Sequence, residues 1–329
     1  MTRLIDLSVV IPIRNEAPSL VELLCEFSET LTAWGRSYEI VVVDDGSTDE
    51  SFEILARLQA GDPHLRVIRF RRNFGQTAAF AAGFAHARGR LIVTSDGDLQ
   101  NDPRDIPAMI AMLEGGYDIV CGWRQDRKDA FVSRRLPSTL ANALISTVTG
   151  VHLHDYGCSL KIFRAEIVKD MKLYGEMHRF LPAIASEQTS SIGEMVVNHR
   201  ARKYGRSKYG IGRTVRVVLD LLTVKFLLSY STRPLQIFGL VGGVMGLAGF
   251  LINGWLAYWK LVGAISLSDP KTGHLPMLLL GILLIFTGFQ LVTLGLLAEL
   301  QVRTYHESQK KATYVIRETL EGLPQADIA

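Results

Sequence analysis

Cysteine is scarce in this chain of 329 residues, and charge of neither sign dominates. The three cysteines, Cys25, Cys121 and Cys158, are widely spaced and odd in number, and the sequence has no CxxC pair. This pattern suggests neither a disulfide framework nor a cysteine zinc site, and it fits a reducing compartment. The formal net charge of +3 gives no overall field of the kind that indicates nucleic acid as a partner.

Glycine-rich phosphate-binding motifs are also missing. No GxGxxG follows the first apolar run, and GxxxxGK[ST] occurs nowhere in the sequence. Dinucleotide-binding and P-loop proteins are therefore disfavoured. The first apolar run ends at Pro12 and has no small-residue cleavage site, so it predicts a first strand rather than a signal peptide.

Charge is absent from two long stretches towards the C-terminus. Residues 235–259 (25 residues) and 275–298 (24 residues) contain no Asp, Glu, Lys or Arg. A bilayer core needs about 20 apolar residues per helix, so both stretches predict transmembrane helices. A pair of buried core helices is the alternative. Gly281, Gly288 and Gly295 recur every seven residues and share one helix face, which favours close helix packing within or between chains.

Basic residues flank these stretches. Residues 195–235 contain nine Lys or Arg and one acid, whereas the loop at 260–274 has only two lysines and one aspartate. Four further basic residues follow the second stretch: Arg303, Lys310, Lys311 and Arg317. By the positive-inside rule, both termini are predicted to be cytoplasmic and the loop external.

Two further segments, 131–150 and 210–230, place Arg on one side and Leu, Val and Ile on the other. Such helices are typical of the membrane interface, with ordinary core-packing helices as the alternative. The predicted organisation starts with a cytoplasmic domain at 1–210, which includes an interfacial helix at 131–150. A juxtamembrane amphipathic helix follows at 211–232. Transmembrane helices at 235–259 and 275–298 are joined by an external loop at 260–274, and a cytoplasmic tail occupies 299–329.

The N-terminal part alternates short β-branched runs with helical stretches. The runs lie at 7–13, 38–46, 65–70, 90–98 and 117–123, and the helical stretches lie at 18–34, 48–60, 76–87 and 103–114. This alternation predicts the α/β class, with a mostly parallel, Rossmann-like sheet covered by helices on both faces. In such sheets, ligands bind at the carboxyl ends of the strands.

Polar residues follow each of these strands. The fourth strand leads into "SDGDLQNDP", which contains Asp96 and Asp98. Two carboxylates with this spacing can face one hard cation, such as Mg²⁺ or Mn²⁺, and that cation can bridge a diphosphate. An isolated pair of this kind is more often a solvated turn, but here other polar loops meet at the same edge.

A calcium EF-hand is the obvious rival for the acidic segment. Its sixth position would be Asn101, where glycine is required. Its twelfth position would be Pro107, where glutamate is required. The calcium-loop interpretation therefore fails.

The motifs "VVIPIRNE", "VVVDDGSTD", "RNFGQTAAFAAGF", "SDGDLQNDP" and "HDYGCSLKIFR" together resemble family 2 glycosyltransferases with the GT-A fold. More narrowly, the chain resembles the membrane-anchored polyprenyl-phosphate glycosyltransferases, which include dolichol-phosphate mannose synthase. The nearest branch by motif is the undecaprenyl-phosphate 4-deoxy-4-formamido-L-arabinose transferases. The resemblance covers nearly the whole chain, including both apolar stretches.

The resemblance implies a role for each matching position. Asp44 or Asp45 would hydrogen-bond the nucleobase, with an Asx turn as the alternative. Asp96 would touch ribose or metal, and Asp98 with Gln100 would ligate the metal. The remaining donor-binding positions are Pro12, Arg14, Glu16 and Gly97, of which Glu16 could instead start the following helix and Gly97 stands where Ala is common.

Asp155 is implied to be a base or an acceptor-site carboxylate, and its alternative is a structural partner for arginine. The proposed chemistry brings two anions together, which calls for several cations. The candidates are Arg124, Arg127, Arg202 and Lys208, each of which could instead be a surface or headgroup-binding charge.

The resemblance implies an inverting transfer from a nucleoside diphosphate sugar, with UDP favoured, to a polyprenyl (undecaprenyl) phosphate. It implies the cytoplasmic side of the bacterial inner membrane and a homo-oligomer, with a tetramer expected. A processive polysaccharide synthase is disfavoured because QxxRW and additional spans are missing. A non-catalytic scaffold is disfavoured because the acidic and arginine sets are intact, and a transporter because the apolar stretches offer no polar site.

Overall fold

The computed structural model describes residues 5–125, 142, 145–147, 149–169, 171, 173, 177–186, 188–201, 203–204, 234–263, 274–308 and 313–321. The predicted helix at 211–232 lies outside the described residues, and so does most of the predicted helix at 131–150. The chain divides into two units. One comprises Met1–Val224 with Ala312–Ala329, and the other is Lys225–Lys311.

The first unit is built on one sheet of eight strands. The strands are β1 (Ile5–Ile13), β2 (Tyr38–Asp44), β3 (Leu65–Phe70), β4 (Gly89–Thr94), β5 (Ile119–Trp123), β6 (Lys161–Arg164), β7 (Ile192–Val196) and β8 (Ile316–Leu320). The helices are α1 (Leu20–Trp34), α2 (Ser51–Gly61), α3 (Gln76–His86), η1 (Pro103–Asp105), α4 (Ile106–Glu114), α6 (Ala165–Lys169), η3 (Met177–Phe180) and α7 (Leu181–Ala185).

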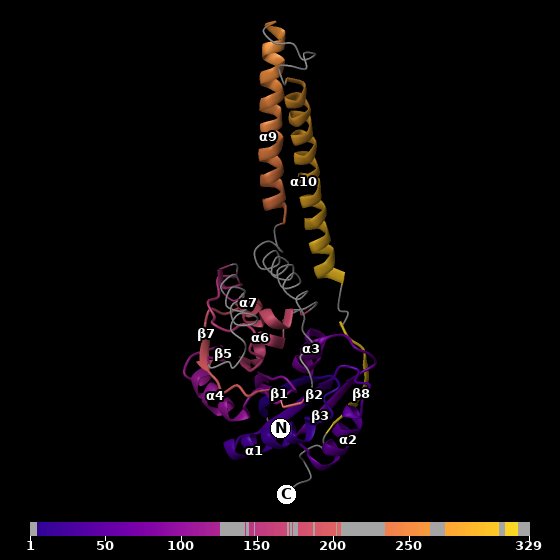
Figure 1. Cartoon of the computed structure of the whole chain (residues 1–329), viewed down its shortest axis with the longest axis vertical. Coiled ribbons are helices and arrows are strands. Elements are labelled where there is room, and N and C mark those ends of the chain that lie inside the picture. Colours follow the sequence, from indigo (N-terminus) through magenta and orange to yellow (C-terminus); the bar gives the residue numbers. More distant parts are fainter. Residues whose placement is uncertain are drawn as a thin grey trace. The chain divides into compact units, whose positions relative to one another are not determined.

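The strand order is β7-β5-β6-β4-β1-β2-β3-β8, with β8 at one edge and β7 at the other (Figure 1). Strands β4, β1, β2 and β3 form a parallel core. Strand β6 runs antiparallel between β4 and β5, and β8 runs antiparallel to β3. The sheet is therefore mixed but mostly parallel, which confirms the predicted α/β fold.

Both faces of the sheet are buried, because successive β1 residues pack against different helices. Leu7, Val9 and Ile11 belong to the hydrophobic core that contains the apolar faces of α1 and α4. Val10 points to the opposite face, where the backbone of α3 comes so close at Gly83 that a Cβ there would clash with the valine. The continuous Val and Ile runs of the central strands follow from this two-sided burial.

The second unit is a helical pair, α9 (Pro234–Leu261) and α10 (His274–Ser308). Both contain segments long and apolar enough to cross a membrane, Phe238–Leu261 and His274–Ala298. Helix α10 continues ten residues beyond the predicted end of the second span at 298.

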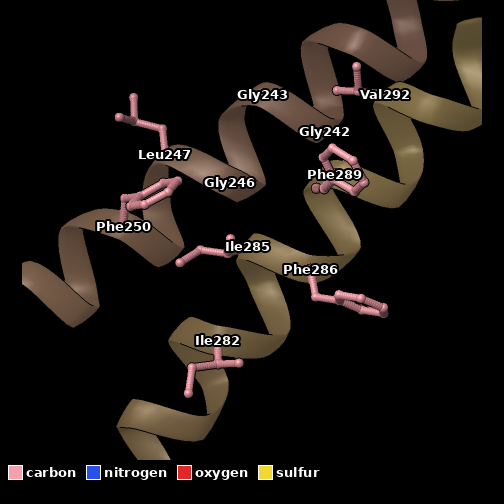
Figure 2. Close-up of a pocket in the computed structure, with 11 residues that line it drawn as sticks. Gly242, Gly243, Gly246, Leu247, Phe250, Ile282, Ile285, Phe286, Phe289 and Val292 are labelled. Atoms are coloured by element: carbon pink, nitrogen blue, oxygen red, sulfur yellow. The ribbon is translucent and has the colours of Figure 1, made fainter.

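Glycines form the contact surface between these helices. A Cβ on Gly242 would lie 2.5 Å from the Gly288 carbonyl oxygen, and one on Gly249 would lie 2.5 Å from that of Gly281. Only glycine permits such an approach. Figure 2 shows Gly242, Gly243 and Gly246 of α9 among the residues of α9 and α10 that line an apolar groove. The glycine pattern of the sequence thus corresponds, at these positions, to a seam within the chain.

Candidate functional site

The loops at the carboxyl ends of β1 and β2 are joined by hydrogen bonds. The Asn15 amide donates to Ser47 Oγ at 2.9 Å, and Asn15 Oδ1 accepts from the Thr48 amide at 2.8 Å. Asn15 has a positive φ of 54°, a region that Asn tolerates better than most residues. The Glu16 amide donates to Ser51 Oγ at 3.0 Å. Asn15 was not among the predicted site residues, although "RNE" directly after a strand is a turn signal.

Asp44 ends β2 in a fully buried position. Its Oδ1 accepts from the Ser47 amide at 2.9 Å, which is the Asx turn that was the alternative for this position. Its Oδ2 is buried without a hydrogen-bond donor among the described residues, and the Arg69 Nε lies 3.8 Å away. Burial raises the pKa of Asp44, against the opposing effects of Ser47 and Arg69.

Asp45 holds the segment that follows β3. Its carboxylate accepts from Asn73 Nδ2 at 2.6 Å and from the amides of Phe74 and Gly75 at 2.7 and 3.0 Å. Burial raises the pKa of Asp45, while these amides and the nearby Arg14 oppose that rise. Three donors fix the carboxylate, so Asp45 organises the loop whatever else it binds.

Gly46 allows the two loops to meet. Its φ is +64°, and a Cβ there would lie 2.5 Å from the Arg72 carbonyl carbon. Of the other predicted donor-site residues, Pro12 is buried in β1, and Arg14 is exposed just beyond that strand. The structure thus brings the predicted residues of the first two strands to one edge of the sheet.

The acidic segment after β4 lies at the same edge. Asp96 Oδ1 accepts from the Gln76 side-chain amide at 2.8 Å. The Gly97 carbonyl accepts from Ser19 Oγ at 2.9 Å, which ties the segment to the start of α1. Asp98 is 8% exposed, and its Oδ1 accepts from the Gln100 amide at 3.2 Å. Gln76 belongs to the polar cluster at 71–76 that is predicted to follow the third strand, but it was given no individual role.

The third aspartate of this segment has a structural environment. Asp102 binds Arg104 at 2.6 Å and Arg200 at 3.0 Å and accepts from the Asn198 side chain at 2.9 Å. Burial alone would raise the pKa of Asp102, but these hydrogen bonds lower it well below its usual range. Two arginines therefore offset the charge of Asp102.

Asp155 and Arg124 form a buried ion pair. Arg124 Nε and Nη2 donate to the two carboxylate oxygens at 2.6 and 2.9 Å. Burial would lower the pKa of Arg124, but the Asp155 carboxylate outweighs it and raises that pKa further. Asp155 also accepts from the Gly157 amide at 3.1 Å, and its own amide donates to Glu194. Asp155 thus has the contacts expected of a structural partner for arginine, which was the alternative for this position. Its role as a base remains a prediction.

A small polar pocket opens beside Asp96. It is lined by Gln76, Phe80, Thr94, Asp96, Tyr156, Gly157, Cys158, Ser159, Lys161, His178, Arg179 and Leu181. Three of these side chains, Lys161, His178 and Arg179, are basic and were not predicted. Lys161 could have been noticed, because it is a charged residue within the otherwise apolar run "LKIF".

Three predicted cations, Arg127, Arg202 and Lys208, lie outside the described residues. Within the described residues, no group of three or more His, Cys, Asp or Glu side chains is arranged to hold a metal ion. Asp96, Asp98 and Gln100 therefore stay the predicted ligands, and oxygens of a bound ligand would have to complete such a site. The Gln100 side-chain nitrogen donates to the Arg200 carbonyl at 3.3 Å.

Comparison with known proteins shows several related proteins. The chain is 46% identical over 327 residues to a dodecaprenyl-phosphate galacturonate synthase from Rhizobium johnstonii, covering 98% of this chain and 95% of the relative. It is 39% identical over 324 residues to an undecaprenyl-phosphate 4-deoxy-4-formamido-L-arabinose transferase from Pseudomonas paraeruginosa, covering 98% and 93%.

A solved structure has the same fold. The glucosyl-3-phosphoglycerate synthase of Mycobacterium tuberculosis, in complex with Mn²⁺ and UDP-glucose, matches with a TM-score of 0.55 at 19% identity. The match covers 69% of this chain and 81% of that protein. The model of the family "Glycosyl transferase family 2" matches residues 8–172, which is half of the chain. With the relatives that align along nearly the full length, this shows that the chain belongs to glycosyl transferase family 2.

Proposed function

We propose that this enzyme transfers a sugar from a nucleoside diphosphate sugar to a polyprenyl phosphate at the membrane surface. The similarity to two polyprenyl-phosphate sugar transferases extends over 98% of the chain, so it includes both apolar helices. UDP is the nucleotide that we favour, and undecaprenyl phosphate is the acceptor. A cytoplasmic active site on a two-helix anchor in a bacterial inner membrane fits the distribution of basic residues.

One observation carries the proposal: Asp96 and Asp98 follow β4 at the edge of the sheet where a pocket with a basic lining opens. A transfer between two phosphate-bearing substrates needs both kinds of group. Carboxylates can hold a cation against a diphosphate, and basic side chains can hold phosphate oxygens.

The donor set of the acidic segment is compatible with a hard divalent cation. Carboxylate and amide oxygens suit Mg²⁺ and Mn²⁺, and a diphosphate can complete the coordination. When bound, such an ion would offset the charge that develops on the leaving diphosphate. Asp96, Asp98 and Gln100 are the residues that we expect to hold it.

The acceptor is already a nucleophile. A phosphate monoester is anionic at neutral pH, so one of its oxygens can attack the anomeric carbon while the bond to the diphosphate breaks. No proton has to be removed, and direct displacement inverts the anomeric centre. The residues at the site therefore have to bind and orient two anions. The ion pair of Asp155 with Arg124 fits this, because Asp155 does not have to act as a general base.

The nucleobase would bind near Asp44 and Asp45. The Oδ2 of Asp44 is a buried acceptor with no donor among the described residues, and the ring N–H of uracil could supply one. This oxygen is enclosed, so the contact requires the covering side chains to move. Arg14 and Glu16, on the neighbouring loop, would line the same pocket.

The test is transfer by the purified protein in mild detergent. It is incubated with undecaprenyl phosphate and a panel of UDP- and GDP-sugars, and the lipid product is analysed by mass spectrometry. We expect one donor class to yield a glycosylated lipid phosphate. Asp98→Asn removes the charge with little change of shape and should abolish the product. Asp105→Asn, in the same segment but bonded to the Asn198 amide, is the matched control. No product with any donor would refute the proposal.

We also propose a homo-oligomer, with a tetramer expected. Large apolar side chains on α9 and α10, such as Phe250 and Phe289, remain exposed and could contact lipid or other subunits. Light scattering in several mild detergents should give a multiple of the 36.5 kDa chain mass. A monomeric mass in all of them would contradict this part.

A further inference from the structure

Lys161 is a buried cation of the basic pocket lining to which the proposed mechanism assigns no particular substrate group. It begins β6, between β4 and β5, and is 3% exposed. Its side chain lines the polar pocket beside Asp96. Its ammonium donates to two main-chain carbonyls of the adjacent loop, those of Tyr156 and Cys158.

Among the described residues, no carboxylate lies within ion-pair distance of this ammonium, whereas the buried Arg66 and the partly buried Arg124 are both paired. Arg66 contacts Glu39 at 2.9 Å, and Arg124 contacts Asp155 at 2.6 Å. Burying a charge without a countercharge is unfavourable. The two neutral carbonyl oxygens accept from two of the three N–H donors of the ammonium but do not compensate its charge.

The two buried thiols nearby cannot supply that charge. Burial raises the pKa of Cys121 to about 12, even though Lys161 opposes this rise. Burial also raises the pKa of Cys158, with Arg124 and Lys161 opposing it. Both thiols are therefore neutral at physiological pH.

The pocket wall opposite β6 is also basic. His178 and Arg179, both in η3, line the same space. Thr77 Oγ1 of α3 and His178 Nδ1 share a hydrogen bond of 2.9 Å, which fixes the imidazole ring beside the pocket. Among the described residues that line the pocket, Asp96 is the one carboxylate. The pocket thus combines a buried ammonium with two further basic side chains from another element.

We propose that Lys161 anchors an oxyanion subsite, in which it binds a negatively charged group of a substrate. That group is either a carboxylate on the transferred sugar, as in a uronic acid, or the phosphate of the lipid acceptor. The inference rests on the proposed function, because it assigns a substrate group to the pocket of the same active site. It gives a binding role to Lys161, which lies in the "HDYGCSLKIFR" motif but was assigned no role there.

The first experiment measures donor binding without acceptor. Affinities for UDP-glucuronate and UDP-galacturonate are compared with those for UDP-glucose, UDP-galactose and UDP, using wild type and Lys161→Met. If the group is a sugar carboxylate, the substitution weakens binding of the two uronates about 10- to 150-fold, the range for loss of one charge-assisted hydrogen bond. Binding of UDP and of the two neutral sugars stays within about twofold.

The second experiment tests the acceptor. If the group is the lipid phosphate, Lys161→Met leaves all donor affinities unchanged and raises the KM for undecaprenyl phosphate by a similar factor. Arg164→Met is the matched control, since Arg164 is a cation at the other end of β6 that is paired with Asp118 at 2.9 Å. It should change neither quantity.

Unchanged uronate affinity together with an unchanged acceptor KM in Lys161→Met would overturn the inference. Retained UDP binding shows that the variant is folded. If it does not fold, Arg179→Met tests the same subsite from η3 with the same two measurements. Failure here is distinct from failure of the proposed function, because the wild-type enzyme would still form a lipid-linked sugar.

Discussion

Replacing Arg69 by methionine should destabilise the sheet edge that carries the predicted nucleobase site. Arg69 lies on β3, with its Nε 3.8 Å from the buried Asp44 carboxylate and its Nη1 3.1 Å from Glu318 of β8. Its guanidinium also stacks over the Phe52 ring at 3.9 Å. Methionine retains most of the apolar stem but removes the charge, so Asp44 is left as a buried carboxylate without a cation.

The size of the effect follows from burial. Asp44 is fully buried, and removing one partner of a buried ion pair costs about 3–5 kcal/mol. The 3.8 Å separation places the effect at the lower end of that range. For a domain of this size, about 3 kcal/mol lowers the midpoint of thermal unfolding by about 6–12 °C. Glu318 is 40% exposed, so Glu318→Gln removes a surface contact worth about 0–1 kcal/mol and is the matched control.

The effect should depend on pH with a definite sign. Burial raises the pKa of Asp44 in the folded protein, and loss of Arg69 raises it further. The charged carboxylate therefore destabilises the variant above that folded pKa. As the pH falls from the folded pKa towards the ordinary value of 3.8, Asp44 takes up a proton and the deficit shrinks.

The assay is intrinsic-fluorescence melting in mild detergent from pH 5 to pH 8, with UDP affinity as a second measurement. We expect Arg69→Met to melt earlier than Glu318→Gln at pH 8, by a margin that narrows at pH 5, and to bind UDP more weakly. Equal midpoints for the two variants across this range would refute the reasoning about Asp44.

Other substitutions test the remaining parts of the site. Asp98→Ala should abolish transfer, and excess EDTA should do the same to wild type; full activity in chelator would contradict the metal assignment. Gly46→Ala places a side chain at a positive φ and against the backbone of Arg72, so the free energies of UDP binding and of unfolding should both fall by about 1–3 kcal/mol. Calorimetric titration measures the UDP affinity, and an unchanged affinity would count against this expectation. Asp155→Asn leaves Arg124 buried without its partner and should lower stability by about 3–5 kcal/mol in chemical denaturation, whereas a near-wild-type midpoint would show that the pair is dispensable. Lys208→Ala should reduce lipid-saturated turnover about 10- to 150-fold with UDP affinity retained, and normal turnover would remove Lys208 from the site.

The central sheet was predictable because its strands are buried on both faces. Runs such as "SVVIPI" and "IVVV" cannot be placed on an exposed surface, and the helices between them have clear lengths. The predicted strand at 65–70 has the observed bounds of β3. The strand predicted at 90–98 ends at Thr94 instead, because the following residues form the acidic loop, in which Leu99 has a positive φ of 62°.

The antiparallel strands were not predicted because their partners are distant in the sequence. Strand β6 has four residues and is inserted between β4 and β5, so its place depends on pairing rather than on local pattern. The pocket residues Lys161, His178 and Arg179 lie on β6 and η3, two elements that were not predicted. The motifs identified positions on the first five strands, whose carboxyl ends meet at one edge in any parallel sheet of this kind.

Strand β8 decides whether the chain can cross a membrane an odd or an even number of times. It follows α10, yet it pairs with β3 in the same sheet as the N-terminal strand β1. A chain that leaves this unit after Val224 and re-enters it at Ala312 must return to the side from which it left. Residues 225–311 can therefore cross an even number of times only, and reporter proteins fused at the two ends of the chain must report the same compartment.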